Sequence, residues 1–199
     1  MEAQLKYLAL GDSYTIGESV EPRDRWPNQL TSLLNQKGFQ ADKPVIIAAT
    51  GWRSDNLMNA VAIANLKEEY DLVSLLIGVN NQYQARPVQE FEMEFEKLLN
   101  TCIRLARGKK ENTFVVSIPD YGFTPFGLKN KEKISVAIDQ FNESIKKICE
   151  KLDVKWIYIT DISREGLNNP ELIASDGLHP SEKMYALWAK QIGETLSLK

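Results

Sequence analysis

Histidine and cysteine are scarce in this sequence, which has one histidine and two cysteines among 199 residues. A structural zinc site takes about four Cys or His ligands, and a catalytic zinc takes about three strong ones. Most zinc sites are therefore excluded. A magnesium or calcium ion held by carboxylates stays open, but no motif supports one, so we expect no metal and no cofactor.

Clustered positive charge and long apolar runs are also lacking. The chain carries 24 Lys and Arg residues against 27 Asp and Glu residues, and its longest basic runs are pairs such as Lys109-Lys110. Nucleic-acid binding uses clustered positive charge, so we expect a small-molecule partner and no nucleic acid. No run approaches the roughly 20 apolar residues of a membrane span, and residues 1–10 lack the regions of a signal peptide. We expect a cytoplasmic protein, unless a leader has been removed; the sequence does not indicate its oligomeric state.

The organisation of the chain is that of one domain spanning residues 1–199, because it has no repeat, low-complexity tract or linker. Short apolar runs rich in β-branched residues predict strands buried on both faces. Helical patterns lie between them, and two of these include Cys102 and Cys149 as buried thiols. Strands are expected at 5–10, 45–49, 72–77, 113–118 and 154–159, and helices at 26–38, 57–64, 91–102, 134–148 and 184–196.

This alternation predicts an α/β fold, because parallel neighbouring strands need crossover connections of this length. The expected architecture is a three-layer α/β/α sandwich with a five-stranded parallel sheet in flavodoxin-like order. In such a sheet, ligands bind outside the carboxyl ends of the strands, near the point where the strand order reverses. The loops at 11–17, 50–55 and 78–82 follow the first three strands and are rich in small polar residues.

The only histidine, His179, follows Asp176 by three residues in the run SDGLHP. Pro180 is expected to open the last helix, and Gly177 permits a tight turn that brings Asp176 back towards the imidazole. An Asp that accepts from Nδ1 leaves Nε2 free as a base, which a serine nucleophile such as Ser13 needs. On these residues alone, a serine that only caps a helix and a surface histidine capped by its neighbour both stay open.

Taken together, four blocks resemble the SGNH hydrolases, also called GDSL-type esterases and lipases. They are GDSYTIG at 11–17, Gly51, GVNN at 78–81 and DGLHP at 176–180. The blocks follow the family's order and spacing, and they span most of the chain. Within the family, the short uninterrupted chain is similar to the bacterial thioesterase and lysophospholipase branch.

The resemblance implies a set of catalytic roles. Ser13 corresponds to the nucleophile, His179 to the base and Asp176 to its orienting partner. The backbone N–H groups of Ser13 and Gly51 and the side chain of Asn80 correspond to the oxyanion hole. The implied function is a serine esterase that hydrolyses small or medium acyl esters through an acyl-enzyme, with lysophospholipids, acyl thioesters and acetylated sugars open as substrates.

Two positions depart from the family pattern. Tyr14 stands where Leu is usual, a change expected to affect packing rather than chemistry. Asn81 stands where Asp is usual and removes a charge close to Asn80. The contact usually made from position 81 is therefore expected to change, while the role of Asn80 is kept.

Five further residues are candidates for substrate binding: Asp12, Trp52, Arg53, Tyr121 and Phe123. Arg53 either meets an anionic group of the substrate or pairs with Asp55. Tyr121 and Phe123 belong to the aromatic run PDYGFTPF at 119–126, which either walls an acyl pocket or packs on the adjacent helix.

Two other function classes are alternatives to the esterase. An aspartyl phosphatase would use Asp12 as nucleophile, but its motif needs a second Asp two residues later, where Tyr14 stands. A flavodoxin-like small-molecule or nucleotide binding module would share the sheet. Such a module would not explain why His179 lies close to Asp176 in the sequence, or why Asn80 is present.

Overall fold

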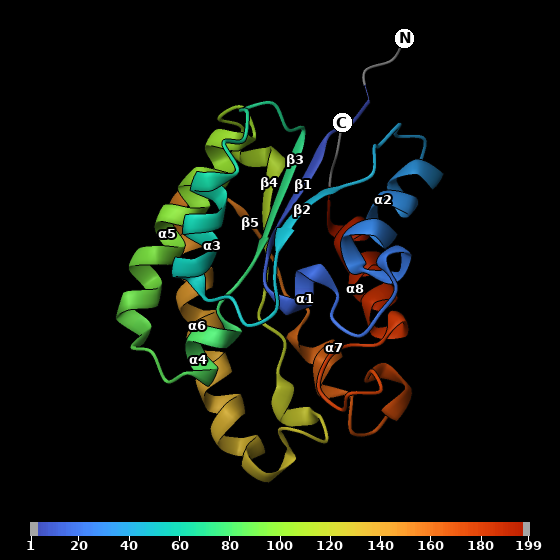
Figure 1. Ribbon diagram of the computed structural model, residues 1–199, viewed down its shortest axis with the longest axis vertical. Helices are drawn as coiled ribbons and strands as arrows, with labels where there is room; N and C mark the ends of the chain where they lie inside the picture. Colours follow the sequence, from blue (N-terminus) through green and yellow to red (C-terminus); the bar gives the residue numbers. More distant parts are fainter. Residues whose placement is uncertain (1–3, 197–199) are drawn as a thin grey trace.

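A five-stranded parallel sheet forms the middle of the molecule (Figure 1). The computed structural model describes residues 4–196. The strands are β1 (Tyr7–Gly11), β2 (Val45–Ala48), β3 (Leu72–Leu76), β4 (Thr113–Val116) and β5 (Lys155–Ile157). Every neighbouring pair is parallel and the order is β2-β1-β3-β4-β5, which confirms the flavodoxin-like order. The order reverses between β1 and β3, so their carboxyl ends mark the expected binding edge.

Helices cover both faces of the sheet and confirm the three-layer sandwich (Figure 1). One face carries α2 (Trp26–Gln36) and α8 (Glu182–Thr195), and the other carries α3 (Ser54–Ile63), α5 (Val88–Leu105) and α6 (Lys131–Leu152). Short helices follow β1, β3 and β5 at the carboxyl edge: α1 (Ser13–Ile16), α4 (Val79–Tyr83) and α7 (Thr160–Arg164). The 3₁₀ turns are η1 (Pro22–Asp24), η2 (Lys110–Asn112), η3 (Tyr121–Phe123), η4 (Leu128–Asn130) and η5 (Pro170–Leu172).

Burial differs between the central and the edge strands. β1, β3 and β4 are buried throughout, as expected. The expectation of burial on both faces is wrong for β2 and β5, because each has a strand on one side only: Val45 is 44% exposed and Lys155 is exposed. Cys102 and Cys149 are buried free thiols, and burial raises the pKa of each to about 12.

The last helix begins later than expected. α8 starts at Glu182, and the Ser181 side chain accepts the N–H of Met184 as its cap. The prediction that Pro180 opens this helix is therefore wrong, because the serine after it takes the capping position. Pro180 instead pairs with Ile173 in an isolated antiparallel bridge, which steadies the loop that carries the histidine.

The described part of the chain, residues 4–196, has no helix that combines the length and the apolar character needed to cross a membrane.

Candidate active site

Ser13 is presented by the turn between β1 and α1. Asp12 caps α1, because its Oδ1 accepts the N–H of Tyr14 at 3.0 Å, and Ser13 is the first residue of the helix. A β-carbon at Gly11 would overlap the Thr15 hydroxyl and lie 2.5 Å from the carbonyl oxygen of Leu76, so this turn requires glycine. The tight turn leaves the Ser13 side chain at the edge of a cavity.

His179 and Asp176 form a hydrogen-bonded pair on the last loop. Nδ1 of His179 lies 2.6 Å from Oδ2 of Asp176. Oδ1 of the same carboxylate accepts the backbone N–H groups of Leu178 and His179, both at 2.9 Å. Gly177 adopts φ +72°, the left-handed turn that was expected to return Asp176 to the ring. Nε2 is thus the ring nitrogen left for chemistry.

The charge on Asp176 is strongly stabilised. Partial burial raises the pKa of this carboxyl, but hydrogen bonds from the Ser19 hydroxyl, from His179 and from the backbone outweigh burial and hold the pKa well below its usual range. The group is therefore a carboxylate at any pH at which the protein is expected to work. It can orient the imidazole and stabilise it when it becomes charged.

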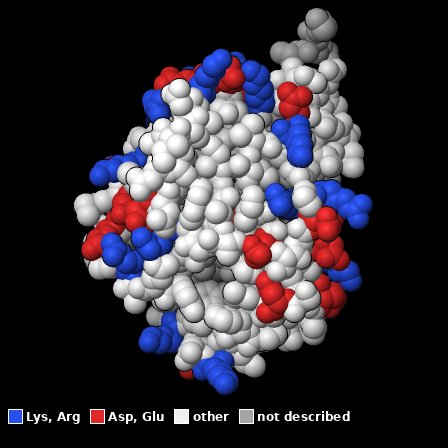
Figure 2. Space-filling model, viewed as in Figure 1, with Lys and Arg blue, Asp and Glu red and all other residues white. Residues whose placement is uncertain are grey.

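One cavity brings the predicted catalytic residues together. Its volume is about 180 Å³, and its lining includes Ser13, Gly51, Asn80 and His179. The cavity lies at the carboxyl edge of the sheet. Figure 2 shows a hollow in the lower half of this face, and the floor of the hollow is white, the colour of residues other than Lys, Arg, Asp and Glu. These four residues come from the ends of β1, β2 and β3 and from the last loop, so only the tertiary fold unites them.

Two asparagines hold the loop around Gly51 beside the cavity. Nδ2 of Asn80 donates to the carbonyl of Trp52 at 2.9 Å, which ties α4 to the loop that contains Gly51. Gly51 itself adopts φ +81°, a conformation that side chains disfavour. Asn81 is buried and binds Ser54 at the start of α3, so the amide at this unusual position anchors the other end of the same loop.

An aromatic wall separates the cavity from a larger cleft. Tyr83, Tyr121 and Phe126 line both spaces, with ring centroids 6.1–6.4 Å apart. The cleft has a volume of about 540 Å³, and Arg86 and Lys133 contribute to its lining. The cavity and the cleft are therefore neighbouring spaces with these three aromatic rings between them.

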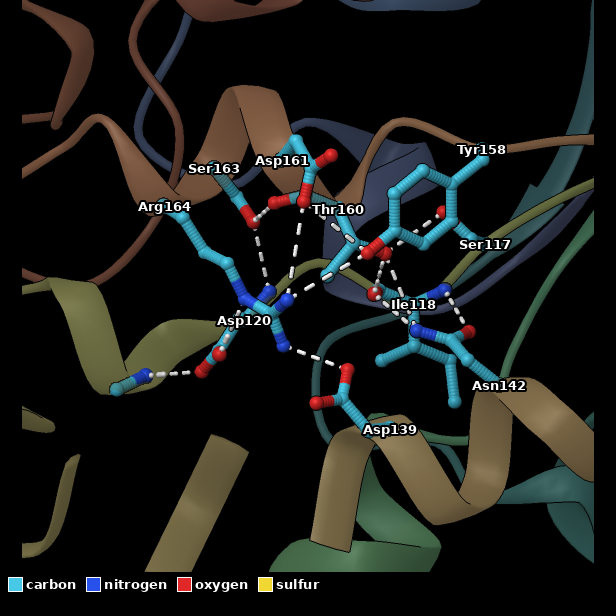
Figure 3. Close-up of polar contacts among 11 residues, drawn as sticks. Ser117, Ile118, Asp120, Asp139, Asn142, Tyr158, Thr160, Asp161, Ser163 and Arg164 are labelled. Atoms are coloured by element: carbon cyan, nitrogen blue, oxygen red, sulfur yellow. Dashed lines mark hydrogen bonds and ion pairs between the residues drawn. The ribbon is translucent and has the colours of Figure 1, made fainter. Parts of the chain in front are cut away.

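An ion pair with a buried carboxylate holds residues 119–126, the aromatic loop, in place (Figure 3). Asp120 is fully buried; its Oδ1 accepts the N–H of Gly122, and its Oδ2 lies 3.0 Å from Nε of Arg164. The same guanidinium binds Asp139 at 2.6 Å. The segment that carries Tyr121 is thus tied to both α7 and α6.

The Asn142 side chain also holds the backbone in this region, through hydrogen bonds of its amide group (Figure 3). Asn142 on α6 accepts the N–H of Ile118 at 2.8 Å and donates to its carbonyl at 2.9 Å. Its Nδ2 also lies 3.1 Å from the Thr160 hydroxyl. The chain leaving β4 therefore enters the aromatic loop from a fixed position.

The other residues predicted to bind substrate lie in different places. Tyr121 lines the cavity, whereas Asp12 is fully buried and is not part of the lining. Trp52, Arg53 and Phe123 are not part of the cavity lining. Arg53 pairs with Asp55 at 2.7 Å, which is the second of its two predicted alternatives, and also donates to Gln84 at 2.7 Å. The ammonium of Lys131 lies 4.8 Å from the Phe123 ring centroid.

Two residues at the site were not predicted from the sequence. Tyr83 lines the cavity, and Ser19 donates to Oδ2 of Asp176 at 2.7 Å. Neither carries a local signal, because Tyr83 is an ordinary residue at the end of α4 and Ser19 lies 157 positions from its partner. Tyr14, which was expected to act in packing, places its ring edge-on to His179 at 5.8 Å between centroids.

Among residues 4–196, no three His, Cys, Asp or Glu side chains gather in an arrangement that could hold a metal ion.

Comparisons with known proteins show the family and the fold of this chain. A family model described as the GDSL-like lipase/acylhydrolase family matches residues 9–187. A search of curated proteins finds no match.

Solved structures with the same fold include three enzymes of 16–18% identity to this chain. A lipolytic G-D-S-L family protein from Veillonella parvula has 16% identity, a TM-score of 0.74 and coverage of 98% of this chain and 100% of that chain. The esterase EstA from a Pseudoalteromonas species, inhibited by monoethylphosphonate, has 16% identity, a TM-score of 0.72 and coverage of 96% and 95%. The acetylxylan esterase Axe2 from Geobacillus stearothermophilus has 18% identity, a TM-score of 0.76 and coverage of 100% and 98%.

Proposed function

We propose that this chain, which belongs to the GDSL-like lipase/acylhydrolase family, hydrolyses small or medium acyl esters with Ser13 as nucleophile, His179 as base and Asp176 as its partner. Family membership makes the chain a carboxylic ester hydrolase and confirms the resemblance to the SGNH hydrolases. One observation carries the assignment of the triad. Ser13 and His179 line the same cavity, and Asp176 binds the Nδ1 side of the ring at 2.6 Å.

In the proposed acylation step, Oγ of Ser13 bonds to the ester carbonyl carbon while Nε2 of His179 takes the hydroxyl proton. The tetrahedral intermediate collapses as His179 passes this proton to the leaving alcohol or thiol. Water then attacks the acyl-enzyme, giving a proton to Nε2, and the second collapse returns that proton to Ser13 and releases the acid. Asp176 stabilises the imidazolium that forms in each half of the cycle.

The oxyanion is held by the backbone N–H groups of Ser13 and Gly51 and by the amide of Asn80. Asn80 gives one N–H to the Trp52 carbonyl at 2.9 Å, which fixes the amide and leaves a second N–H for the substrate. Donors held in place before the reaction need no reorganisation as charge develops. Loss of one such donor typically costs about 10² to 10³ in turnover.

The substrate class follows from the two spaces on either side of the aromatic wall. The catalytic cavity of about 180 Å³ suits a small or medium acyl group, and the adjoining cleft of about 540 Å³ offers room for the rest of the ester. Acetylated sugars, acyl thioesters and lysophospholipids are the candidate substrates. The acetylxylan esterase among the structural relatives supports the first of these.

A fluorophosphonate probe tests the catalytic assignment, because it bonds to a serine that a nearby base activates. We expect Ser13 to be labelled in the wild type and unlabelled in Ser13→Ala. Ser32→Ala is the matched control, since Ser32 is an exposed serine on α2 whose hydroxyl donates to the carbonyl of Asn28 in the same helix. A folded wild type that stays unlabelled would overturn the proposal and favour a binding module.

Ester turnover by His179→Ala gives a second measure. We expect no turnover above that of Ser13→Ala, because the chain has one histidine and no other imidazole can replace it.

A panel of p-nitrophenyl esters of increasing acyl length then measures the size limit of the cavity. We expect kcat/KM to fall once the acyl chain outgrows it.

A further inference from the structure

Asp176 is bound by two side chains at a single oxygen. Oδ2 accepts the Ser19 hydroxyl at 2.7 Å and lies 2.6 Å from Nδ1 of His179. Oδ1 accepts two backbone N–H groups, so both oxygens have two partners each. In the described part of the chain, Ser19 is the one side chain other than His179 that binds this carboxylate.

Ser19 reaches Asp176 from a turn that is anchored on the nucleophile. The N–H groups of Gly17 and Glu18 both donate to the carbonyl of Ser13 at 3.0 Å. Gly17 and Ser19 then adopt left-handed conformations, with φ +69° and +66°. Glycine would adopt this backbone more easily than serine at position 19, so the backbone alone does not account for a serine there.

The neighbouring side chain reaches the opposite side of the cavity. Glu18 accepts the hydroxyl of Thr50, the residue before Gly51. Thr50 and Gly51 both line the catalytic cavity. The segment after Ser13 is thus connected through Glu18 to the loop that contains Thr50 and Gly51, and through Ser19 to the loop that contains Asp176.

We infer that Ser19 is a positioning residue for catalysis, which fixes the Asp176 carboxylate so that its Oδ2 faces His179. This inference rests on the proposed function. The hydroxyl restrains rotation of the carboxylate, because a group bound at both oxygens from separate elements cannot turn without breaking a hydrogen bond. It also takes up part of the negative charge at Oδ2, which moderates how firmly the carboxylate holds the imidazolium.

Other titratable groups face this pair, and they stay unchanged when Ser19 is replaced. Tyr14 on α1 lies edge-on to the imidazole. Tyr14 also interacts electrostatically with Asp12 before α1, with Asp120 and Tyr121 at η3 and with Tyr185 on α8. Tyr185 in turn interacts with Asp176 and with Glu18 on the turn. A difference from the wild type that Ser19→Ala and Ser19→Gly share therefore reports on the hydroxyl.

Ser19→Ala and Ser19→Gly together separate the hydroxyl from the backbone. Both remove the hydroxyl, but glycine relieves the left-handed strain that alanine keeps. We expect kcat/KM to fall about 10-fold in both variants, because each loses a hydrogen bond to a charged group. The acidic limb of the kcat/KM profile should move to higher pH in both, since a carboxylate with one donor fewer holds the imidazolium more firmly. Ser32→Ala is the control for serine removal.

A proton NMR signal gives a readout that does not depend on turnover. The single histidine makes the downfield resonance of its Nδ1–H assignable without ambiguity. We expect this resonance to shift in both Ser19 variants and to keep its wild-type position in Ser32→Ala. A Ser19→Gly variant with wild-type activity, pH profile and resonance would show that only the backbone matters, and would overturn the inference.

The outcomes distinguish this inference from the proposed function. A wild type that neither labels with fluorophosphonate nor hydrolyses esters overturns the proposed function, and the catalytic role of Ser19 with it. An active wild type whose Ser19 variants match Ser32→Ala in pH profile and resonance overturns the role of Ser19 alone.

Discussion

Asn81 and Ser54 are joined by two hydrogen bonds. Oδ1 of Asn81 accepts the backbone N–H of Ser54 at 3.0 Å, and its Nδ2 donates to Oγ of Ser54 at 2.7 Å. The Ser54 hydroxyl is thereby free to donate onwards to Glu94 on α5. Each polar atom in this series of hydrogen bonds has a defined donor or acceptor role. The series requires an amide at position 81, because the side chain there both accepts and donates.

Asn81→Asp should therefore destabilise the protein although it restores the residue usual in the family. A carboxylate cannot donate to Oγ, so it would compete with Glu94 for the one hydroxyl hydrogen of Ser54, and two carboxylates would face each other across it. We expect a loss of about 1–3 kcal/mol in the free energy of unfolding at pH 8. Repulsion and burial raise the pKa of the new carboxyl, so the loss should shrink as the pH falls towards 4. Denaturant unfolding at several pH values measures this.

Glu94→Gln provides the control for this reading. Added to Asn81→Asp, it removes the second carboxylate and should recover part of the lost stability at pH 8. A double-mutant cycle that shows no coupling between positions 81 and 94 would contradict the hydrogen-bond chain.

Gly51→Ala tests whether Gly51 has the proposed oxyanion role or serves only the backbone conformation. Gly51 has φ +81°, and an added β-carbon there would meet no atom within 4 Å. The cost to stability should be about 1–2 kcal/mol, from the left-handed conformation alone. Gly108 offers a matched control, because it has φ +74° and equally open surroundings but follows α5 at the opposite edge of the sheet.

Turnover should separate these two glycine variants. We expect Gly51→Ala to lower kcat about 10-fold or more, because the strained backbone moves an N–H away from the oxyanion. Gly108→Ala should lose similar stability and keep wild-type kcat. Equal kcat values in the two variants would count against the role of Gly51.

Asp12→Asn should show a stability gain that depends on pH. Burial raises the pKa of Asp12 to about 7, and its Oδ2 has no hydrogen-bond partner within residues 4–196. The folded protein thus holds a proton that the unfolded chain releases between pH 3.8 and about 7. Over this interval Asp12 lowers the stability of the wild type by up to about 4 kcal/mol. Above pH 7 the contribution of Asp12 no longer changes with pH.

The amide removes that dependence, because it keeps the acceptor for the N–H of Tyr14 and does not ionise. Relative to wild type, Asp12→Asn should gain stability steadily from pH 4 to 7 and show a constant difference above pH 7. Thermal unfolding followed across this range measures it. A difference that does not vary with pH would show that Asp12 has an ordinary pKa.

Arg164→Ala should destabilise the aromatic loop far more than Asp139→Ala. Arg164 binds both carboxylates, but Asp120 is fully buried whereas the Asp139 side chain is 54% exposed. Removing the arginine leaves Asp120 as an unpaired buried charge, at a cost of about 3 kcal/mol. Losing the exposed partner should cost less than about 1 kcal/mol. Adding Asp120→Asn to Arg164→Ala should recover stability; if it does not, the ion pair is not what holds the loop.

Much of the fold could be predicted from the sequence because strand and helix patterns are local. Each of the five expected strands is present within two residues at either end, and each of the five expected helices has its counterpart. Two errors have physical causes. Apolar runs at β2 and β5 were expected to be buried on both faces, although strand order puts them at the edges. Pro180 was expected to open α8, but the hydroxyl of Ser181 takes the cap.

The sequence by itself determined the chemistry that is available: one imidazole, an aspartate three residues before it, and a serine after the first strand. The Asp176–His179 contact was predictable because a glycine turn closes it within four residues. Two other contacts were not predictable, because each joins segments far apart in the chain: that of Ser19 with Asp176 and that of Asn81 with Ser54. Hydrogen bonds of this kind depend on where the sheet order places each loop, so only the tertiary structure decided them.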